Sequence, residues 1–188
     1  MNTLTKETPL LNFSHPAIQS LMAEKKWKEM DKIERVKSIY NYVRDDIKFG
    51  YNVSDTISAS QVLADGYGQC NTKATLLMAL LRACNIPNRI HGFTIDKELQ
   101  KGAISGIWYK LSPQEILHSW VEIYVNEQWY FLEGVILDKE YLTKLQEQNP
   151  NCKTTFCGFG AYPDDFENPP IYWTLNNTYI QENGINTD

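Results

Sequence analysis

Histidine is scarce in this chain, with three among 188 residues, and cysteine occurs only four times. Any chemistry that needs an imidazole must therefore use His15, His91 or His118. Positive charge is also in short supply, because 18 lysines and arginines stand against 23 acidic residues and give a net charge of −5. Such a chain lacks the basic surface that favours nucleic acids or anionic lipids. We expect neither of them as a partner.

Long hydrophobic runs are absent as well, since none reaches the roughly 18 residues that a membrane span requires. Residues 1–9 lack the charged and then apolar pattern of a signal peptide, so we expect a cytoplasmic protein with reduced thiols. No calcium-loop motif is present, and Cys152 and Cys157 have no second ligand pair to complete a zinc site. We therefore expect no cofactor and no metal, and interpret these two thiols as unpaired.

Several segments show the periodicity of helices. Asp31 is a good N-cap, Glu34 follows at capping-box spacing, and apolar residues then recur at helical intervals, which predicts a helix over 32–47. Further helices are expected over 16–30, around 59–63 and over 139–148, whereas 1–14 and 96–113 are expected to be irregular. The length suits a single domain over residues 1–188.

The cysteine at position 70 has the sequence context of a reactive thiol. It follows two glycines, Gly66 and Gly68, and precedes a run that is apolar on nearly every face, which predicts a helix buried in the domain. The unpaired N–H groups and the dipole at a helix N-terminus favour a thiolate. A buried free cysteine is the ordinary alternative. Cys84, near the end of the same helix, is interpreted as a core residue.

A predicted hairpin can supply a base and a group that orients it. If Asn126 and Glu127 form a two-residue turn, Trp120 pairs with Glu133 across the strands. Side chains alternate along a strand, so His118 and Glu133 then lie on one face as diagonal neighbours within reach of each other. A three-residue loop would instead place them on opposite faces. Each residue also has an ordinary interpretation, as a packed histidine and as a solvated carboxylate.

The other two histidines are weaker candidates. His91 is an alternative base, although no carboxylate has a comparable predicted position beside it. His15 lies in the irregular first segment, where we expect it to be exposed. The pairing of His118 with Glu133 is therefore the preferred hypothesis.

From about Ile33 to Asp138 the sequence resembles the transglutaminase-like superfamily. The resemblance is carried by three blocks in the family's order. They are Gly-Gln-Cys at 68–70 with Ala-Leu-Leu-Arg-Ala at 79–83, Asn-Ile-Pro-Asn-Arg at 85–89, and His-Ser-Trp-Val-Glu-Ile-Tyr at 118–124 with Trp-Tyr-Phe-Leu-Glu at 129–133. The family usually has Gly-Ile-Pro-Ala-Arg in the second block, and Asn85 suits the same left-handed position.

The resemblance implies an α+β, papain-like fold in which a helix headed by Cys packs on an antiparallel sheet. It implies a core over about 33–138 with an irregular C-terminal extension over 139–188. It also implies a triad of Cys70, His118 and an acid. That acid is Glu133 here, where the family normally has Asp, and Asp138 is the fallback. For the second oxyanion donor, Tyr51, Gln61 and Gln69 all remain candidates.

The expected function is a cysteine-dependent acyl-transfer enzyme that acts on an amide bond of a protein or peptide and forms a thioester. Water is the default acceptor, since nothing in the sequence identifies an amine-binding site, so hydrolysis is preferred over transamidation. The alternatives are a catalytically silent binding domain of the same fold and a metal or redox protein built on Cys152 and Cys157. The oligomeric state and the substrate stay open.

Overall fold

The computed structural model describes residues 2–102, 106 and 111–184. The parts of the 96–113 connection at 103–105 and 107–110 lie outside the described residues. The α-helices are α1 (Pro16–Glu24), α2 (Lys32–Asp45), α3 (Ala59–Asp65), α4 (Cys70–Ala83) and α6 (Lys139–Gln148). The 3-10 turns are η1 (Asn2–Thr5), η2 (Trp27–Glu29), η3 (Lys97–Gln100), η4 (Glu133–Val135) and η5 (Glu182–Gly184). The strands are β1 (Lys48–Phe49), β2 (Tyr67–Gly68), β3 (Asn88–Asp96), β4 (Glu115–Val125) and β5 (Gln128–Leu132).

The larger sheet is antiparallel, with the order β3–β4–β5, and β1 pairs with β2 in a short parallel sheet. In the β4–β5 hairpin Val125 pairs with Gln128, which confirms the predicted register. Asn126 and Glu127 have positive φ values of 50° and 65°. This is the left-handed backbone of a type I′ turn, whose twist matches the strands. The hairpin therefore has the two-residue connection on which the alignment of His118 depends.

Helix α2 confirms the capping argument. The Asp31 carboxylate accepts hydrogen bonds from the backbone N–H groups of Ile33 and Glu34, and so satisfies free donors at the helix start. The helix ends at Asp45, two residues before its predicted end. Helix α4 is buried along most of its length and is followed by Asn85 with a φ of 57°, as expected for its left-handed position.

The first helix differs from its prediction. Over 16–30 the structure has α1 as far as Glu24 and then the separate turn η2, with Lys26 in a left-handed conformation between them. The break lets Trp27 enter the core, where it is fully buried and its ring N–H donates to Ser38 Oγ at 2.8 Å. The burial of one large aromatic side chain thus outweighs the helical pattern.

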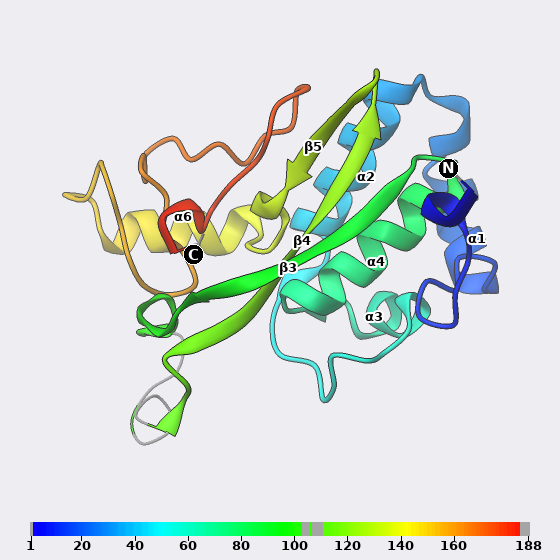
Figure 1. The fold of residues 1–188 in the computed structure, drawn as a ribbon. Helices are drawn as coiled ribbons and strands as arrows, with labels where there is room; N and C mark the ends of the chain where they lie inside the picture. Colours follow the sequence, from blue (N-terminus) through cyan, green and yellow to red (C-terminus); the bar gives the residue numbers. More distant parts are fainter. Residues whose placement is uncertain (1, 103–105, 107–110, 185–188) are drawn as a thin grey trace.

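The buried apolar residues form two clusters. Figure 1 shows α1 to α4 together on one side of the hairpin sheet, and α6 with the C-terminal segment beside it. The helical cluster joins the inward faces of α1–α4 to Val121, Ile123 and Val125 of β4. The C-terminal cluster consists of Ile136, Leu137, Leu142, Leu145, Ala161, Phe166, Ile171 and Ile180. Among the described residues, no helix is both long and apolar enough to cross a membrane.

The C-terminal segment beyond α6 has little regular structure, as expected, yet it is closely tied to the sheet. Thr178 bridges to Leu132 at the end of β5, and its carbonyl accepts the backbone N–H groups of Glu133 and Gly134. The segment thereby runs alongside the turn η4. This contact decides the environment of Glu133.

Candidate active site

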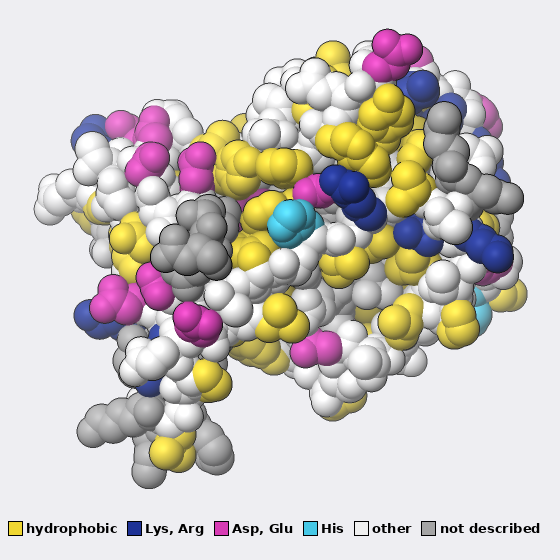
Figure 2. All heavy atoms as spheres, in the orientation of Figure 1, with side chains coloured by type: hydrophobic (Ala, Val, Ile, Leu, Met, Phe, Trp, Pro, Cys, Tyr) yellow, Lys and Arg dark blue, Asp and Glu magenta, His cyan; other side chains and the backbone are white. Residues whose placement is uncertain are grey.

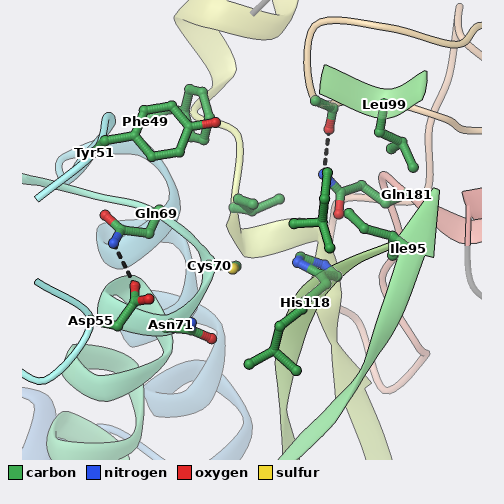
Figure 3. A pocket seen from close by; sticks show the side chains of 14 residues that line it. Phe49, Tyr51, Asp55, Gln69, Cys70, Asn71, Ile95, Leu99, His118 and Gln181 are labelled. Atoms are coloured by element: carbon green, nitrogen blue, oxygen red, sulfur yellow. Dashed lines mark hydrogen bonds between the residues drawn. The ribbon is translucent and has the colours of Figure 1, made fainter. Parts of the chain in front are cut away.

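The Cys70 thiol lies at the first turn of α4 and lines a cavity of about 180 Å³. The cavity is bordered by β1 and the loop after it, by the ends of β3 and β4, and by the C-terminal segment. Its lining residues are Phe49, Tyr51, Asp55, Gln69, Cys70, Asn71, Ile95, Leu99, Ile116, Leu117, His118, Ile136, Gly160 and Gln181. Cys70 is half-buried, and Figure 3 shows its sulfur facing His118 across the cavity. The helix N-terminus thus presents the thiol to a histidine.

The imidazole of His118 is held between the thiol and a carboxylate. His118 is buried on β4, and its Nε2 lies 3.0 Å from Oε1 of Glu133. Because Nε2 is engaged there, Nδ1 is the ring nitrogen left for the thiol of Cys70. The edge of the same imidazole contacts the Phe93 ring, with 5.2 Å between centroids. The structure therefore brings together the two residues that the hairpin register predicted as neighbours.

Glu133 stands directly after β5, at the start of η4, and is 1% exposed. Its Oε1 faces His118, while its Oε2 accepts hydrogen bonds from the backbone N–H groups of Ile180 and Gln181. The chain leaves the strand direction at Leu132, whose φ and ψ are −116° and 57°. This turn accommodates the longer side chain of Glu where the resembling family has Asp.

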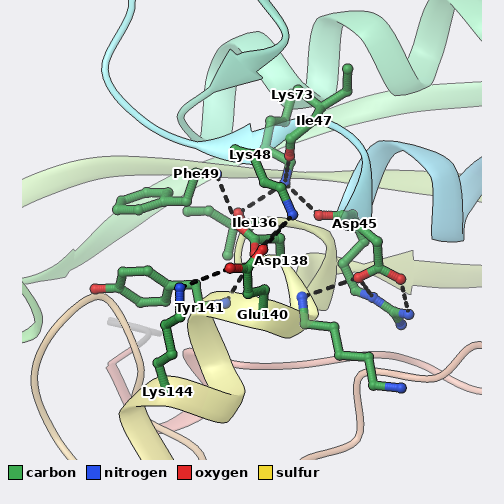
Figure 4. Close-up of polar contacts among 12 residues, drawn as sticks. Asp45, Ile47, Lys48, Phe49, Lys73, Ile136, Asp138, Glu140, Tyr141 and Lys144 are labelled. Carbon is green, nitrogen blue, oxygen red and sulfur yellow. Dashed lines mark hydrogen bonds and ion pairs between the residues drawn. The ribbon is translucent and has the colours of Figure 1, made fainter.

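The fallback acid Asp138 has a different place. It caps α6, since its Oδ1 accepts from the Tyr141 N–H at 2.9 Å, and its Oδ2 accepts from the Phe49 N–H at 3.1 Å. Lys48 lies 3.7 Å away, and Figure 4 shows the carboxylate between these groups. Among the described residues it is Glu133, and not Asp138, that contacts His118.

The electrostatics of the site favour a charged imidazole. Burial lowers the pKa of His118, because a low-dielectric environment disfavours the cation. Hydrogen bonds with Cys70 and Glu133, together with the negative charges of both groups, outweigh this effect and raise the pKa of His118 to about 9. The buried carboxylate is itself stabilised by the two backbone donors. The arrangement can therefore hold a proton on His118 at neutral pH.

The three candidates for a second oxyanion donor differ in their surroundings. Tyr51 lines the cavity, and burial and the nearby charge of Cys70 raise the pKa of its hydroxyl. The Gln69 carboxamide also faces the cavity, but its Nε2 donates to Asp55 Oδ1 at 2.6 Å. Gln61 donates to Asp65 Oδ1 at 2.7 Å and does not line the cavity. Tyr51 is thus the candidate whose donor faces the cavity without such a bond.

The other histidines lie outside the cavity. His15 is exposed, as expected, and its Nδ1 accepts the Ala17 N–H at the start of α1. The expectation for His91 was wrong in one respect, since its Nδ1 lies 2.9 Å from Oε1 of Glu122 on the neighbouring strand. The two positions are not directly paired, because β3 places His91 opposite Trp120. Figure 2 shows one face of the molecule, on which apolar side chains surround a histidine with acidic and basic side chains close by.

The remaining cysteines show no shared site. Cys84 is buried at the end of α4, and burial raises the pKa of its thiol. Cys152 is half-buried and Cys157 is exposed, and both are free thiols. Within the described parts of the chain, no group of three or more His, Cys, Asp or Glu side chains could hold a metal ion.

Two contributions to the site were missed by sequence reasoning. The first is the pair of N–H groups from Ile180 and Gln181, for which backbone atoms leave no residue signal. The second is Lys73, one turn after Cys70, whose Nζ donates to the carbonyls of Arg44, Ile47 and Ile136 at 3.0, 2.7 and 3.1 Å (Figure 4). Burial lowers the pKa of Lys73 to about 7. The signal in the sequence was a lysine at the start of an apolar helical run.

The sequence model of the Transglutaminase-like superfamily matches residues 19–134, more than half of the chain. The match includes Cys70, His118 and Glu133 and ends just before the C-terminal cluster begins. A search of curated proteins found no match.

The chain also matches parts of longer proteins whose structures have been solved. The periplasmic domain of TgpA from Pseudomonas aeruginosa, bound to ethylmercury, has a TM-score of 0.44 at 14% identity, covering 68% of this chain and 45% of that one. A protein from Cytophaga hutchinsonii, described as a proposed cysteine protease, gives 0.43 at 19% identity, covering 70% and 43%. Red sea bream transglutaminase gives 0.38 at 18% identity, covering 65% and 25%. The chain thus spans less than half the length of each.

Proposed function

Because the chain belongs to the transglutaminase-like superfamily, we propose that it is a cysteine-dependent acyl-transfer enzyme that acts on amide bonds of a protein or peptide. Cys70 is the nucleophile, His118 the base and then the acid, and Glu133 the group that orients His118. The observation that carries the proposal is the buried pair of His118 and Glu133, 3.0 Å apart, beside the cavity that Cys70 lines. Burial of such a pair is expensive unless it is hydrogen-bonded, as this one is.

The proposed reaction follows from these positions. His118 takes the proton of Cys70, and the thiolate forms a bond to the carbonyl carbon as the carbonyl electron pair moves onto oxygen. The Cys70 N–H and the Tyr51 hydroxyl donate to that oxyanion. The C–N bond then breaks, the amine takes the proton from His118, and a thioester remains. Water, deprotonated by His118, attacks the thioester and releases the acid and the free thiol.

Hydrolysis is preferred over transfer to an amine, because water needs no dedicated binding site. The alternative of a silent binding domain is not favoured. Such a domain would gain nothing from a carboxylate that is 1% exposed and aligned by two backbone donors toward a histidine. This degree of alignment is what general acid–base chemistry requires.

Alkylation of the four thiols tests the proposal. We expect iodoacetamide at pH 7 to label Cys70 faster than Cys84, Cys152 and Cys157, because Cys70 stands at a helix N-terminus and faces His118, the proposed base. The His118→Ala variant should lose this advantage. The matched control is His91→Ala, which removes a histidine paired with a carboxylate outside the cavity and should leave the labelling rate unchanged. Equal and slow labelling of all four thiols would refute the proposal.

Acyl transfer itself can be followed with 4-nitrophenyl acetate. The expected product is an acetyl adduct on Cys70 that hydroxylamine removes, as it would a thioester. Its formation should fall by about 100- to 10,000-fold in His118→Ala, since general base catalysis contributes that much. An adduct on lysine residues alone, stable to hydroxylamine, would show that Cys70 does not act as an acyl acceptor.

A further inference from the structure

Gln181, which lines the cavity, carries a buried hydrogen-bond acceptor that no described residue pairs with. The residue is 3% exposed, and its Nε2 donates to the Gly160 carbonyl at 2.6 Å. Its backbone N–H is one of the two donors to Glu133. Among the described residues, however, its Oε1 is buried without a hydrogen-bond partner. Buried polar atoms are nearly always paired in folded proteins, so this exception needs an explanation.

The identity of the unpaired atom is settled by its neighbour. A carbonyl oxygen can only accept, so the atom of the carboxamide that faces Gly160 must be the NH₂ group. The opposite orientation would bring two oxygens together and leave two donors unpaired. The atom that remains is therefore an acceptor, and a molecule bound in the cavity can satisfy it only with a donor. Leaving it unsatisfied lowers stability.

The surroundings restrict what that donor can be. The wall near Gln181 is apolar, with Ile95, Leu99 and Ile116 from β3, η3 and β4. Among the described residues, no lysine or arginine lines the cavity, so the wall near Gln181 offers no such cation to an anionic group. A neutral N–H on an apolar group matches both the acceptor and the wall.

The position of Gln181 relative to Cys70 indicates which part of the substrate it meets. Figure 3 shows Gln181 and Leu99 on the His118 side of the sulfur, whereas Phe49, Tyr51 and Gln69 lie on the other side. In the proposed reaction His118 gives its proton to the departing amine, so the amine half of the substrate belongs on the His118 side.

We infer that Gln181 Oε1 accepts a hydrogen bond from the N–H of the amine half of the substrate, and that the site selects secondary amides with an apolar group on nitrogen. The choice of the amine half rests on the proposed function. A peptide bond that is followed by an apolar residue fits this description. Gln181 then sets specificity with its side chain while its backbone aligns Glu133.

Two small probes of similar shape test the inference. N-butylacetamide carries one N–H and a butyl group, and butyl acetate has an ester oxygen in place of the N–H. Both are titrated by NMR into the Cys70→Ala variant, which binds without reacting. We expect the amide to bind about three- to tenfold more tightly than the ester, the usual effect of one neutral hydrogen bond. Gln181→Met in the same background should remove the difference, because Met fills the space without an acceptor.

The matched control is Gln146→Met. Gln146 also donates its Nε2 to a carbonyl of the C-terminal segment, Phe166 O at 2.6 Å, but it does not line the cavity. This variant should keep the preference for the amide. Equal binding of amide and ester to Cys70→Ala, a preference that survives Gln181→Met, or no binding of either probe would each overturn the inference.

The design also separates this inference from the proposed function. The amide–ester comparison in Cys70→Ala needs no reactive thiol and no second substitution. It therefore tests whether the cavity prefers an amide N–H even if Gln181→Met does not fold. A preference for the amide in a protein whose Cys70 resists alkylation would support Gln181 as a binding residue and contradict acyl transfer. If Cys70 is alkylated rapidly but the amide and the ester bind equally, acyl transfer stands and the role of Gln181 is overturned.

Discussion

The helical cluster and the C-terminal cluster meet at the first turn of α4, where Cys70 packs against the second while Ala74 and Leu76 lie in the first. The helical cluster is built from regular helices and a sheet, and it positions the thiol and His118. The C-terminal cluster is mostly irregular chain and follows the part that matches the family. Ile180 of this cluster and the adjacent Gln181 nevertheless supply the N–H groups that hold Glu133. Regular structure places two members of the site, and irregular structure aligns the third.

The largest expected effect comes from Glu133, the residue on which the two regions converge. Glu133→Gln keeps the size of the side chain but removes its charge. It also replaces one carboxylate oxygen, which accepts hydrogen bonds, with an NH₂ group, which donates them. Formation of the acetyl adduct on Cys70 should therefore fall by about 100- to 10,000-fold, as expected when a histidine loses its orienting carboxylate. The measurement is the rate of adduct formation by mass spectrometry. An unchanged rate would mean that another group orients His118.

Replacing Glu133 with the shorter acid Asp tests its alignment separately from its charge. Glu133→Asp keeps the charge but cannot reach His118 and the two backbone donors together, because it lacks one methylene. We expect a smaller loss of about 10- to 100-fold, typical of a misplaced catalytic group. A full rate in Glu133→Asp would show that the C-terminal donors contribute nothing to alignment.

A matched pair of isoleucines compares the two clusters directly. Ile39 of the helical cluster and Ile180 of the C-terminal cluster are both 0% exposed. Each change to alanine should lower the free energy of unfolding by about 2–5 kcal/mol, as measured in urea. At temperatures where both variants stay folded, only Ile180→Ala should slow the alkylation of Cys70, because it loosens the donors to Glu133. Equal slowing in both would remove the proposed distinction.

The pH dependence of stability follows from the pKa of His118, raised from 6.5 to about 9. Between these values His118 carries a proton in the folded state that the same side chain has released in the unfolded chain, so its contribution to stability falls as pH rises. This contribution is complete below pH 6.5 and lost above about pH 9, and it amounts to roughly 3 kcal/mol at most. Urea denaturation should show that the free energy of unfolding of the unchanged protein falls between these pH values. In His118→Asn this dependence on pH should be lost. A parallel slope in both would contradict the charged histidine.

The smallest effect is expected at the hairpin turn, far from the C-terminal cluster. Glu127 has a φ of 65°, which glycine adopts without strain. Glu127→Gly should therefore raise the free energy of unfolding by about 0.5–1 kcal/mol and leave the labelling of Cys70 unchanged. As a control, Glu147→Gly at an exposed position of α6 should lower the free energy of unfolding by about the same amount. A loss of stability in Glu127→Gly would contradict the turn.

The parts of the site that were predictable are those with a periodic or local cause. The turn at Asn126 and Glu127 sets the register, and the register places His118 near Glu133, so a local turn was enough to predict this contact. The same logic failed for His91, because its partner Glu122 is a diagonal neighbour across the β3–β4 pair, whose register no short turn sets. The break after α1 was also missed, since the burial of Trp27 is a tertiary effect.

By itself the sequence determined the helix that begins at Cys70, the hairpin that carries His118, and the family to which the chain belongs. These follow from hydrophobic periodicity, capping and turn chemistry, which act over a few residues. Only the tertiary structure decided how Glu133 is held and what Gln181 offers to the cavity. Both depend on backbone atoms and on an irregular segment more than forty positions later in the chain, where hydrogen bonds form only after the chain has packed.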